Sequence, residues 1–301
     1  MKSLMDGEYK VKLNGITHWI RVAGSKNNTT PLVILHGGPG GNQYVFERTI
    51  GLLLSNSRTV IYYEQRGCGR TEKPSDDTKY SIDLLIEDFK SLRKWLEVKK
   101  LDLLGYSFGG ELALEVAHAD PKVINKIVLS GPSLINSEIN KMVQITGFCS
   151  VVDNQMYKQM QNVLKEGLTI DETYNTFWEL VDSKSVDLLL FENQEIGKKN
   201  RILWEESNLV NTGLMFKALQ KNPVKIPLLD RLKEIQQQSL IITGVFDRNT
   251  GISISKIIHK GLRNSDIVLF NNSAHFPDLE EPEKFNMTVQ EFLDQKVVSL
   301  L

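Results

Sequence analysis

The amino-acid sequence predicts an α/β protein with a mostly parallel twisted sheet, helices on both faces and an inserted helical segment. Residues 33–35 and 127–129 form continuous apolar runs, without the alternation of apolar and polar residues seen in strands that have one face in solvent. Such runs are typical of parallel strands buried on both faces. Stretches with helical spacing separate these runs, as in βαβ units. The pattern breaks over residues 134–225, where helical periods occur without a clear strand.

The individual elements can be placed in order along the chain. Alternating apolar residues predict an opening hairpin over 9–13 and 16–23, with Asn14-Gly15 at its turn. Strands are then expected at 31–35, 58–65, 101–105, 126–132, 237–247 and 265–270, and helices at 81–98, 108–119, 253–262 and from Pro282. We therefore predict a core domain formed by residues 1–133 and 226–301, and a helical cap, or lid, formed by residues 134–225.

Composition restricts the class of function. The 301 residues are 41% hydrophobic and 24% charged, which is ordinary for a globular protein. A net charge of −1 gives no reason to expect nucleic acid or an anionic membrane as a partner. Two cysteines, Cys68 and Cys149, are too few for a disulfide framework, and no apolar run matches a signal peptide or membrane span. A cytoplasmic protein without a metal or organic cofactor is expected.

One serine lies between two glycines where a predicted strand meets a predicted helix. The segment is Gly105-Tyr106-Ser107-Phe108-Gly109. A sharp strand-to-helix turn forces its central residue into an unfavourable backbone conformation, and the flanking glycines remove side chains that would clash. The alternative is a turn with no catalytic role. The context favours Ser107 as an exposed nucleophile.

A serine nucleophile needs a base, and the position of one histidine suits that task. His275 follows the predicted strand 265–270, in a loop at the edge where open parallel sheets bind ligands. His36 stands at the start of a glycine-rich loop and is expected to brace it. His275 is therefore the predicted base.

The base in turn needs a carboxylate that orients it. Asp247 follows the apolar strand 239–244 at its carboxyl end, whereas Asp266 and Asp278 are expected to be solvent-facing caps. The resulting chain order of serine, aspartate and histidine is the one that accompanies a nucleophile at such a turn. Asp247 is the predicted orienting acid.

Acyl transfer also requires donors for the developing oxyanion. The backbone amide of Phe108, next to the nucleophile, is one candidate. The glycine-rich loop 36–41 supplies the other, for which we select the amide of Gly38. A phosphate-binding loop is the alternative, but no Gly-Lys-Ser/Thr follows.

The chain resembles the α/β-hydrolase superfamily over nearly its whole length. The motifs that carry this resemblance are HGGPGG at 36–41, EQRGCGR at 64–70, GYSFGG at 105–110, Asp247 and SAH ending at His275. Within it they resemble the proline iminopeptidase branch. The resemblance implies an α/β-hydrolase fold, a helical cap at 134–225 and family roles for Ser107, Asp247 and His275. Glu64 stands where many relatives carry aspartate.

The substrate prediction departs from that branch. Its iminopeptidases hold a substrate ammonium with acidic side chains, one of them directly after the triad aspartate. Here that position is Arg248, and in the stretch 207–213 an acid is replaced by Asn208. We therefore expect a serine hydrolase (an esterase or lactonase) that cleaves a carboxylic ester or lactone, a class in which bulky natural products such as macrolides are included. A proline iminopeptidase acting on short peptides and a non-catalytic ligand sensor remain the alternatives.

Five side chains are expected to contact the substrate: Tyr106, Trp178, Trp204, Arg248 and Phe276. For the aromatic residues of 134–225 the alternative is that they form the core of that segment.

Overall fold

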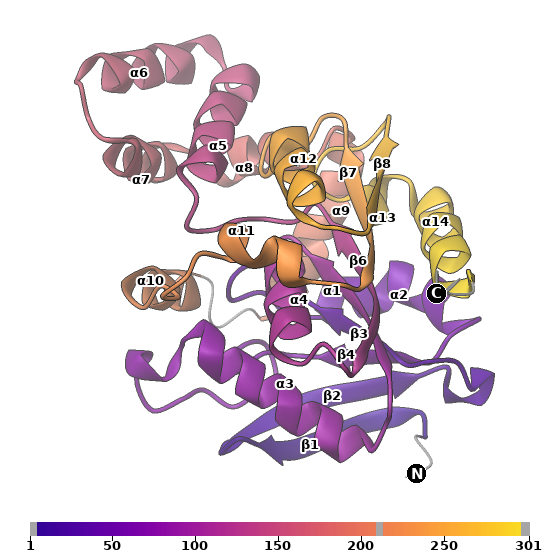
Figure 1. Ribbon diagram of the computed structural model, residues 1–301. Helices are drawn as coiled ribbons and strands as arrows, with labels where there is room; N and C mark the ends of the chain where they lie inside the picture. Colours follow the sequence, from indigo (N-terminus) through magenta and orange to yellow (C-terminus); the bar gives the residue numbers. More distant parts are fainter. Residues whose placement is uncertain (1–4, 209–212, 296–301) are drawn as a thin grey trace.

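A single eight-stranded sheet organises the computed structural model, which describes residues 5–208 and 213–295 (Figure 1). The strand order is β1-β2-β4-β3-β5-β6-β7-β8. The strands are β1 (Gly7–Leu13), β2 (Ile16–Ala23), β3 (Leu32–Leu35), β4 (Val60–Tyr63), β5 (Leu101–Tyr106), β6 (Ile124–Ser130), β7 (Gln238–Gly244) and β8 (Ser265–Phe270). The predicted fold class is confirmed.

The sheet is parallel except at its first edge. β1 and β2 form the predicted antiparallel hairpin, and β2 pairs antiparallel with β4. All the remaining pairs, from β4–β3 to β7–β8, are parallel. The carboxyl ends of β3, β5, β7 and β8 therefore lie at the same edge of the sheet.

Helices cover both faces of the sheet. One apolar cluster packs α3 (Ile82–Leu96), α4 (Phe108–Ala119) and α12 (Gly251–Gly261) against one face. A second cluster packs α1 (Tyr44–Arg48), α2 (Ile50–Ser55) and α14 (Pro282–Asp294) against the other. The short α1 and α2, between β3 and β4, were not among the predicted elements. The short α13 (Pro277–Glu280) precedes α14.

Between β6 and β7 the described chain is helical. It forms α5 (Glu138–Val151), α6 (Asn154–Lys165), α7 (Ile170–Leu180), α8 (Ser183–Leu190), α9 (Gln194–Glu206), α10 (Leu214–Lys221) and the short α11 (Leu228–Arg231). In Figure 1, α5, α6 and α7 project away from the sheet, at the upper left. Phe148, Met160, Phe177 and Leu189 form a separate apolar cluster there. We call α5–α10 the inserted helices. Across residues 5–208 and 213–295, no helix is both long and apolar enough to cross a bilayer.

Two glycines let α4 begin close to the sheet. A Cβ on Gly109 would lie 1.9 Å from the carbonyl oxygen of Leu35, and a Cβ on Gly105 would lie 2.1 Å from that of Gly109. Both neighbours are backbone atoms, which cannot move aside as a flexible side chain could. The glycines on either side of Ser107 are therefore required by close packing of β3, β5 and α4.

Replacing Gly109 with alanine is expected to destabilise the protein by on the order of 3 kcal/mol or more, because α4 would have to move away from β3. Gly167→Ala provides a control: its Cβ would meet nothing within 4 Å, so only its φ of +70° opposes the change. That control should cost about 1 kcal/mol. Urea unfolding of both variants measures the difference, and equal effects would contradict the packing argument.

Candidate active site

The predicted catalytic residues lie at the carboxyl edge of the sheet. Ser107 directly follows β5, Asp247 follows β7 and His275 follows β8. The glycine loop after β3 reaches the nucleophile, since a Cβ on Gly37 would lie 2.9 Å from the Cβ of Ser107. A Cβ on Gly131 would lie 3.2 Å from Nδ1 of His275 and 3.3 Å from Oδ2 of Asp247. Strands far apart in the sequence thus bring these groups to one edge.

Ser107 adopts the strained backbone that its neighbours suggested. Its φ and ψ are 54° and −124°, a combination that is energetically unfavourable for any residue with a Cβ. Its N–H donates to the carbonyl of Ser130 at 2.9 Å, and its carbonyl accepts the N–H of Gly110 at 2.9 Å. The side chain is half-buried. These bonds hold the turn in place despite its strain.

Asp247 and His275 form a buried pair. Nδ1 of His275 donates to Oδ2 of Asp247 at 3.1 Å, and that oxygen also accepts the Thr250 hydroxyl at 2.8 Å. Oδ1 accepts the N–H groups of Asn249 at 2.9 Å and Thr250 at 3.0 Å. Burial by itself would raise the pKa of Asp247. The charge and hydrogen bond of His275, together with two hydrogen bonds from Thr250, instead lower that pKa to about 2. The carboxylate is therefore ionised at neutral pH and fixes the tautomer of the ring.

The second ring nitrogen of His275 has a partner that the sequence did not suggest. Nδ2 of Asn249 lies 3.0 Å from Nε2. Within the described residues, no hydrogen bond joins the hydroxyl of Ser107 to that nitrogen. The backbone N–H of His275 donates to the carbonyl of Leu190 at 3.0 Å, so α8 contacts the histidine loop directly.

Of the two candidate oxyanion donors, Phe108 directly follows the nucleophile, and Gly38 directly follows Gly37, which approaches it. Phe108 is the first residue of α4, so its N–H has no intrahelical acceptor. Gly38 is exposed and has a φ of 122°. His36 braces this loop as expected: Nδ1 donates to the carbonyl of Gly37 at 2.9 Å, and Nε2 accepts the N–H of Gln65 at 3.0 Å. Burial lowers the pKa of His36 to about 4, which keeps the ring neutral and in this role.

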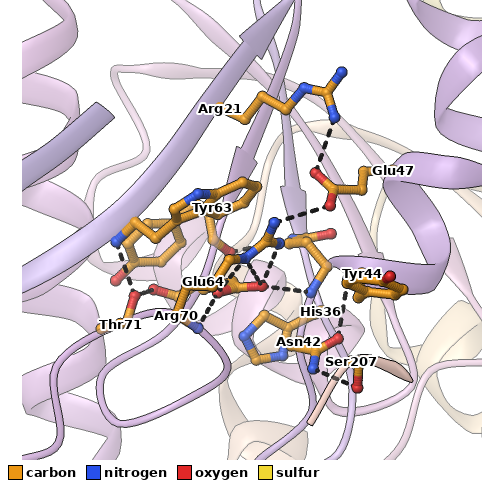
Figure 2. Close-up of polar contacts among 12 residues, drawn as sticks. Arg21, His36, Asn42, Tyr44, Glu47, Tyr63, Glu64, Arg70, Thr71 and Ser207 are labelled. Carbon is orange, nitrogen blue, oxygen red and sulfur yellow. Dashed lines mark hydrogen bonds and ion pairs between the residues drawn. The ribbon is translucent and has the colours of Figure 1, made fainter. Parts of the chain in front are cut away.

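Glu64 anchors the far end of the same loop. Its buried carboxylate accepts the N–H of Gln43 at 3.1 Å, the N–H of Arg70 at 2.6 Å and the Arg70 guanidinium at 2.7 Å. Arg70 also pairs with Glu47 at 2.9 Å, and Figure 2 shows the guanidinium between the two carboxylates. In the same view Asn42 reaches Ser207, at the end of α9, at 3.2 Å. Glu64 therefore ties the loop that carries Gly38 to the segment after β4.

Glu64→Gln is expected to destabilise the protein by about 3 kcal/mol, because it leaves the Arg70 guanidinium partly unpaired beside a buried amide. A loosened loop should also lower turnover. Glu72→Gln is a matched control in the same segment, because Glu72 is exposed and accepts the N–H of Thr17 at 2.8 Å. Urea unfolding and kcat/KM of both variants test this role. Similar losses in the two would refute it.

Asp278 is buried, contrary to the expectation that it is a solvent-facing cap. Asp278 lies in α13 and is 5% exposed, and among the described residues its Oδ1 has no hydrogen-bond partner. Asp266 is exposed, as expected. Burial raises the pKa of Asp278 to about 7, although the nearby His275 opposes the shift. A second carboxyl group, besides that of Asp247, therefore lies near the candidate triad, and the local sequence around Asp278 gave no sign of its burial.

The raised pKa of Asp278 predicts a pH dependence of stability. The folded state retains the proton up to about pH 7, whereas the unfolded state loses it near pH 4, so unfolding releases a proton in between. The contribution of Asp278 to stability should therefore fall as the pH rises from about 4 to 7. Urea unfolding at several pH values should show a shallower fall for Asp278→Asn than for the wild type. Parallel curves would contradict the assignment.

The predicted substrate contacts have different surroundings. Phe276 stacks on Phe191 of the inserted segment, with ring centroids 5.1 Å apart, and lies edge-on to His275 at 4.9 Å. Tyr106 stacks on Phe46, and its hydroxyl donates to the carbonyl of Asn42 at 3.0 Å. Phe276 therefore touches the candidate base itself, while Tyr106 supports the glycine loop.

The other three lie on or against the inserted helices. Arg248 forms an ion pair with Glu192 at 2.6 Å, which balances its charge. Trp178 donates to Gln144 at 3.0 Å and packs in the apolar cluster of the inserted helices, in keeping with the alternative of a core role. Trp204 lines a cavity of about 740 Å³ between α8 and α9, which none of the triad candidates lines. Of the stretch 207–213, residues 209–212 lie outside the described residues, and Asn208 is exposed.

Within the described part of the chain, no group of three or more histidine, cysteine, aspartate or glutamate side chains is arranged to hold a metal ion.

Comparison with known proteins places this arrangement in a family. The model of the alpha/beta hydrolase fold family matches residues 30–282, which include the serine turn, Asp247 and His275. The chain belongs to the α/β-hydrolase fold family. Among curated relatives, this α/β hydrolase is 28% identical over 295 residues to the proline iminopeptidase of Saccharolobus solfataricus, covering 91% of this chain and 87% of the relative. It is likewise 28% identical over 293 residues to that of Clostridioides difficile, covering 93% and 95%.

Solved structures show the same fold. A proline iminopeptidase-related protein from Thermus thermophilus superposes with a TM-score of 0.79 at 21% identity, covering 96% of this chain and 98% of that one. An esterase from Exiguobacterium antarcticum superposes with a TM-score of 0.68 at 18% identity, covering 97% and 100%. This α/β hydrolase is thus proline iminopeptidase-like, as its motifs suggested, and its structural neighbours include both iminopeptidases and esterases.

Proposed function

We propose that this α/β hydrolase is a serine hydrolase that cleaves a carboxylic ester or lactone. The Ser107 oxygen attacks the carbonyl carbon while Nε2 of His275 takes its proton. The amides of Gly38 and Phe108 stabilise the oxyanion, and Asp247 stabilises the imidazolium. His275 then protonates the departing alkoxide. Water, deprotonated by the same nitrogen, then attacks the acyl-enzyme, and His275 returns that proton to the Ser107 oxygen as the acid is released.

The hydrogen bond of 3.1 Å between Asp247 and His275 carries this proposal. Asp247 and His275 follow strands that end at the same sheet edge as Ser107, whose backbone is strained. A carboxylate, a histidine and such a serine are the combination that activates a weak nucleophile, which supports the proposal. A buried His–Asp pair without a nucleophile nearby would be a structural feature only. The position of Ser107 next to Gly37 and Phe108 supports the catalytic role.

Charge at the site supports an ester or lactone in preference to an N-terminal prolyl peptide. Arg248 follows Asp247 directly and carries a cation where a substrate ammonium would need a carboxylate. Its ion pair with Glu192 neutralises that charge but also engages the acid that could compensate for it. A neutral acyl compound requires no such anchor. Phe276 and Phe191, next to the candidate base, suit an apolar acyl group, and bulky natural products such as macrolides are included in the proposed range.

The relatives support a second candidate, an aminopeptidase that releases N-terminal proline. Two assays distinguish the candidates: 4-nitrophenyl esters of increasing acyl size, with a macrocyclic lactone, and L-proline 4-nitroanilide. We expect turnover of the esters and little of the anilide. Strong preference for the prolyl anilide, lost when its nitrogen is acetylated, would replace our proposal by the aminopeptidase. No turnover of any substrate, with Ser107 unreactive toward a fluorophosphonate, would support a ligand sensor.

A further inference from the structure

Asn249 holds the nitrogen of His275 on which the proposed reaction depends. Nδ2 of Asn249 lies 3.0 Å from Nε2, while Asp247 holds Nδ1 at 3.1 Å. Both ring nitrogens are therefore bound by side chains of one short loop. In the described residues, Ser107 makes no hydrogen bond to Nε2.

The chemistry of the ring defines the direction of this bond. Asp247 is an acceptor only, so Nδ1 of His275 carries the hydrogen and Nε2 of the neutral ring carries a single lone pair. The group facing that lone pair must be a donor, which the Asn249 amide nitrogen is. The hydroxyl of Ser107 must donate to the same lone pair when it loses its proton. The two donors therefore compete for one acceptor.

The loop places Asn249 by fixed contacts. Its backbone N–H donates to Oδ1 of Asp247 at 2.9 Å. The hydroxyl of Thr250 lies 3.2 Å from the carbonyl oxygen of Gly131 and 2.8 Å from Oδ2 of Asp247. The same bonds that position the orienting acid therefore hold Asn249 opposite Nε2, and the side chain itself is half-buried.

We propose that Asn249 caps the catalytic base in the resting protein and must release Nε2 before Ser107 can be deprotonated. The inference rests on the proposed serine hydrolase mechanism and adds a residue that regulates it. Because the amide touches a reacting atom, its removal should change the rate of the chemical step itself. A neutral hydrogen bond is strong enough to slow that step without preventing it.

Several charged groups surround the ring and remain in place when Asn249 is changed. Asp247 faces Nδ1, and the carboxyl group of Asp278 in α13 lies close enough to interact with the imidazole. Glu280, also in α13, interacts with Asp278 and accepts the N–H of Ala274 at 2.7 Å. Arg248, in the same loop as Asn249, is paired with Glu192. None of these groups donates to Nε2, so Asn249→Leu removes the cap alone.

The rate at which a fluorophosphonate labels Ser107 tests the inference without a known substrate. Asn249→Leu keeps the approximate volume and removes the donor, and Asn249→Ala removes both. We expect both variants to be labelled about two- to tenfold faster than the wild type near pH 8, the change that loss of one neutral hydrogen bond produces. If both variants are labelled faster by similar factors, the cause is loss of the hydrogen bond, because only Asn249→Ala also loses side-chain volume.

The pH profile of labelling supplies a readout that a structural role would not move. A donor to Nε2 favours the neutral imidazole. In Asn249→Leu, which lacks that donor, the acid limb of the profile (the pH range over which labelling declines as the pH falls) should therefore move to higher pH by roughly 0.3 to 1 unit. Asn249→Asp offers an acceptor for a protonated Nε2. It should move the limb further in the same direction and label more slowly than the wild type at pH 7.

The possible results separate the inference from the proposed function. Suppose that the wild type is labelled, but Asn249→Leu is labelled no faster and its pH profile is unchanged. This result overturns the inference and leaves the proposed serine hydrolase function intact. A wild type that is not labelled at Ser107 overturns both. Mass spectrometry of the labelled peptide identifies the site, and thermal unfolding shows whether each variant is folded.

Discussion

Ser107→Ala is expected to lower turnover of any ester substrate by about 10⁴- to 10⁶-fold, because no other group can form the acyl-enzyme. The residual rate would come from substrate binding and the oxyanion donors. The measurement is kcat with a nitrophenyl ester, together with fluorophosphonate labelling, which should be absent. Turnover close to that of the wild type would refute the assignment of the nucleophile.

Ser107→Gly separates the chemical role of this residue from its backbone strain. Ser107 has a φ of 54° and a ψ of −124°, which glycine adopts without a clash. The glycine variant should be as inactive as the alanine variant. However, it should be more stable than the alanine variant by on the order of 1 kcal/mol, because release of strain outweighs the added flexibility of the unfolded chain. Equal stability in urea would show that the turn is not strained.

Elements with a local signal could be predicted from the sequence. The helix predicted at 81–98 is α3 (Ile82–Leu96): Ser81 caps its start by accepting the N–H of Leu84, and Glu97 ends it with a φ of 54°. The predicted helix 108–119 is α4. By contrast, α1 and α2 are too short for a helical period to be visible. Apolar periodicity and turn residues thus gave the sheet and its longer helices.

The side chains that the sequence did not reveal are those defined by contacts between distant segments. Asp278 is buried because α13 packs beside β7, and nothing in its neighbours along the chain indicates this. The contact of Asn249 with His275 depends on how two loops meet. Glu64 could be located by its motif, but its role appears only when Gln43 and Arg70 are placed around it. Motifs therefore indicated which residues could react, and the fold showed which other side chains contact them.

Asp247→Asn is expected to lower kcat/KM by about 10⁴-fold while the protein stays folded. The backbone N–H groups of Asn249 and Thr250 both point at Oδ1, so the amide oxygen of the variant will occupy that position. The amide NH₂ then takes the place of Oδ2 and faces Nδ1 of His275, where it can only donate.

The His275 ring must then accept at Nδ1 and carry its hydrogen on Nε2, so it cannot take the proton of Ser107. Thr250→Val is the matched control, because it removes the hydroxyl that Oδ2 accepts but leaves the carboxylate facing His275. The control should lose far less activity, about tenfold or less, since one neutral hydrogen bond is removed. Steady-state kinetics of both variants decide the matter. If Asp247→Asn retained activity comparable to Thr250→Val, the carboxylate would not be setting the tautomer of His275, and another acid would have to be sought among the groups around the ring.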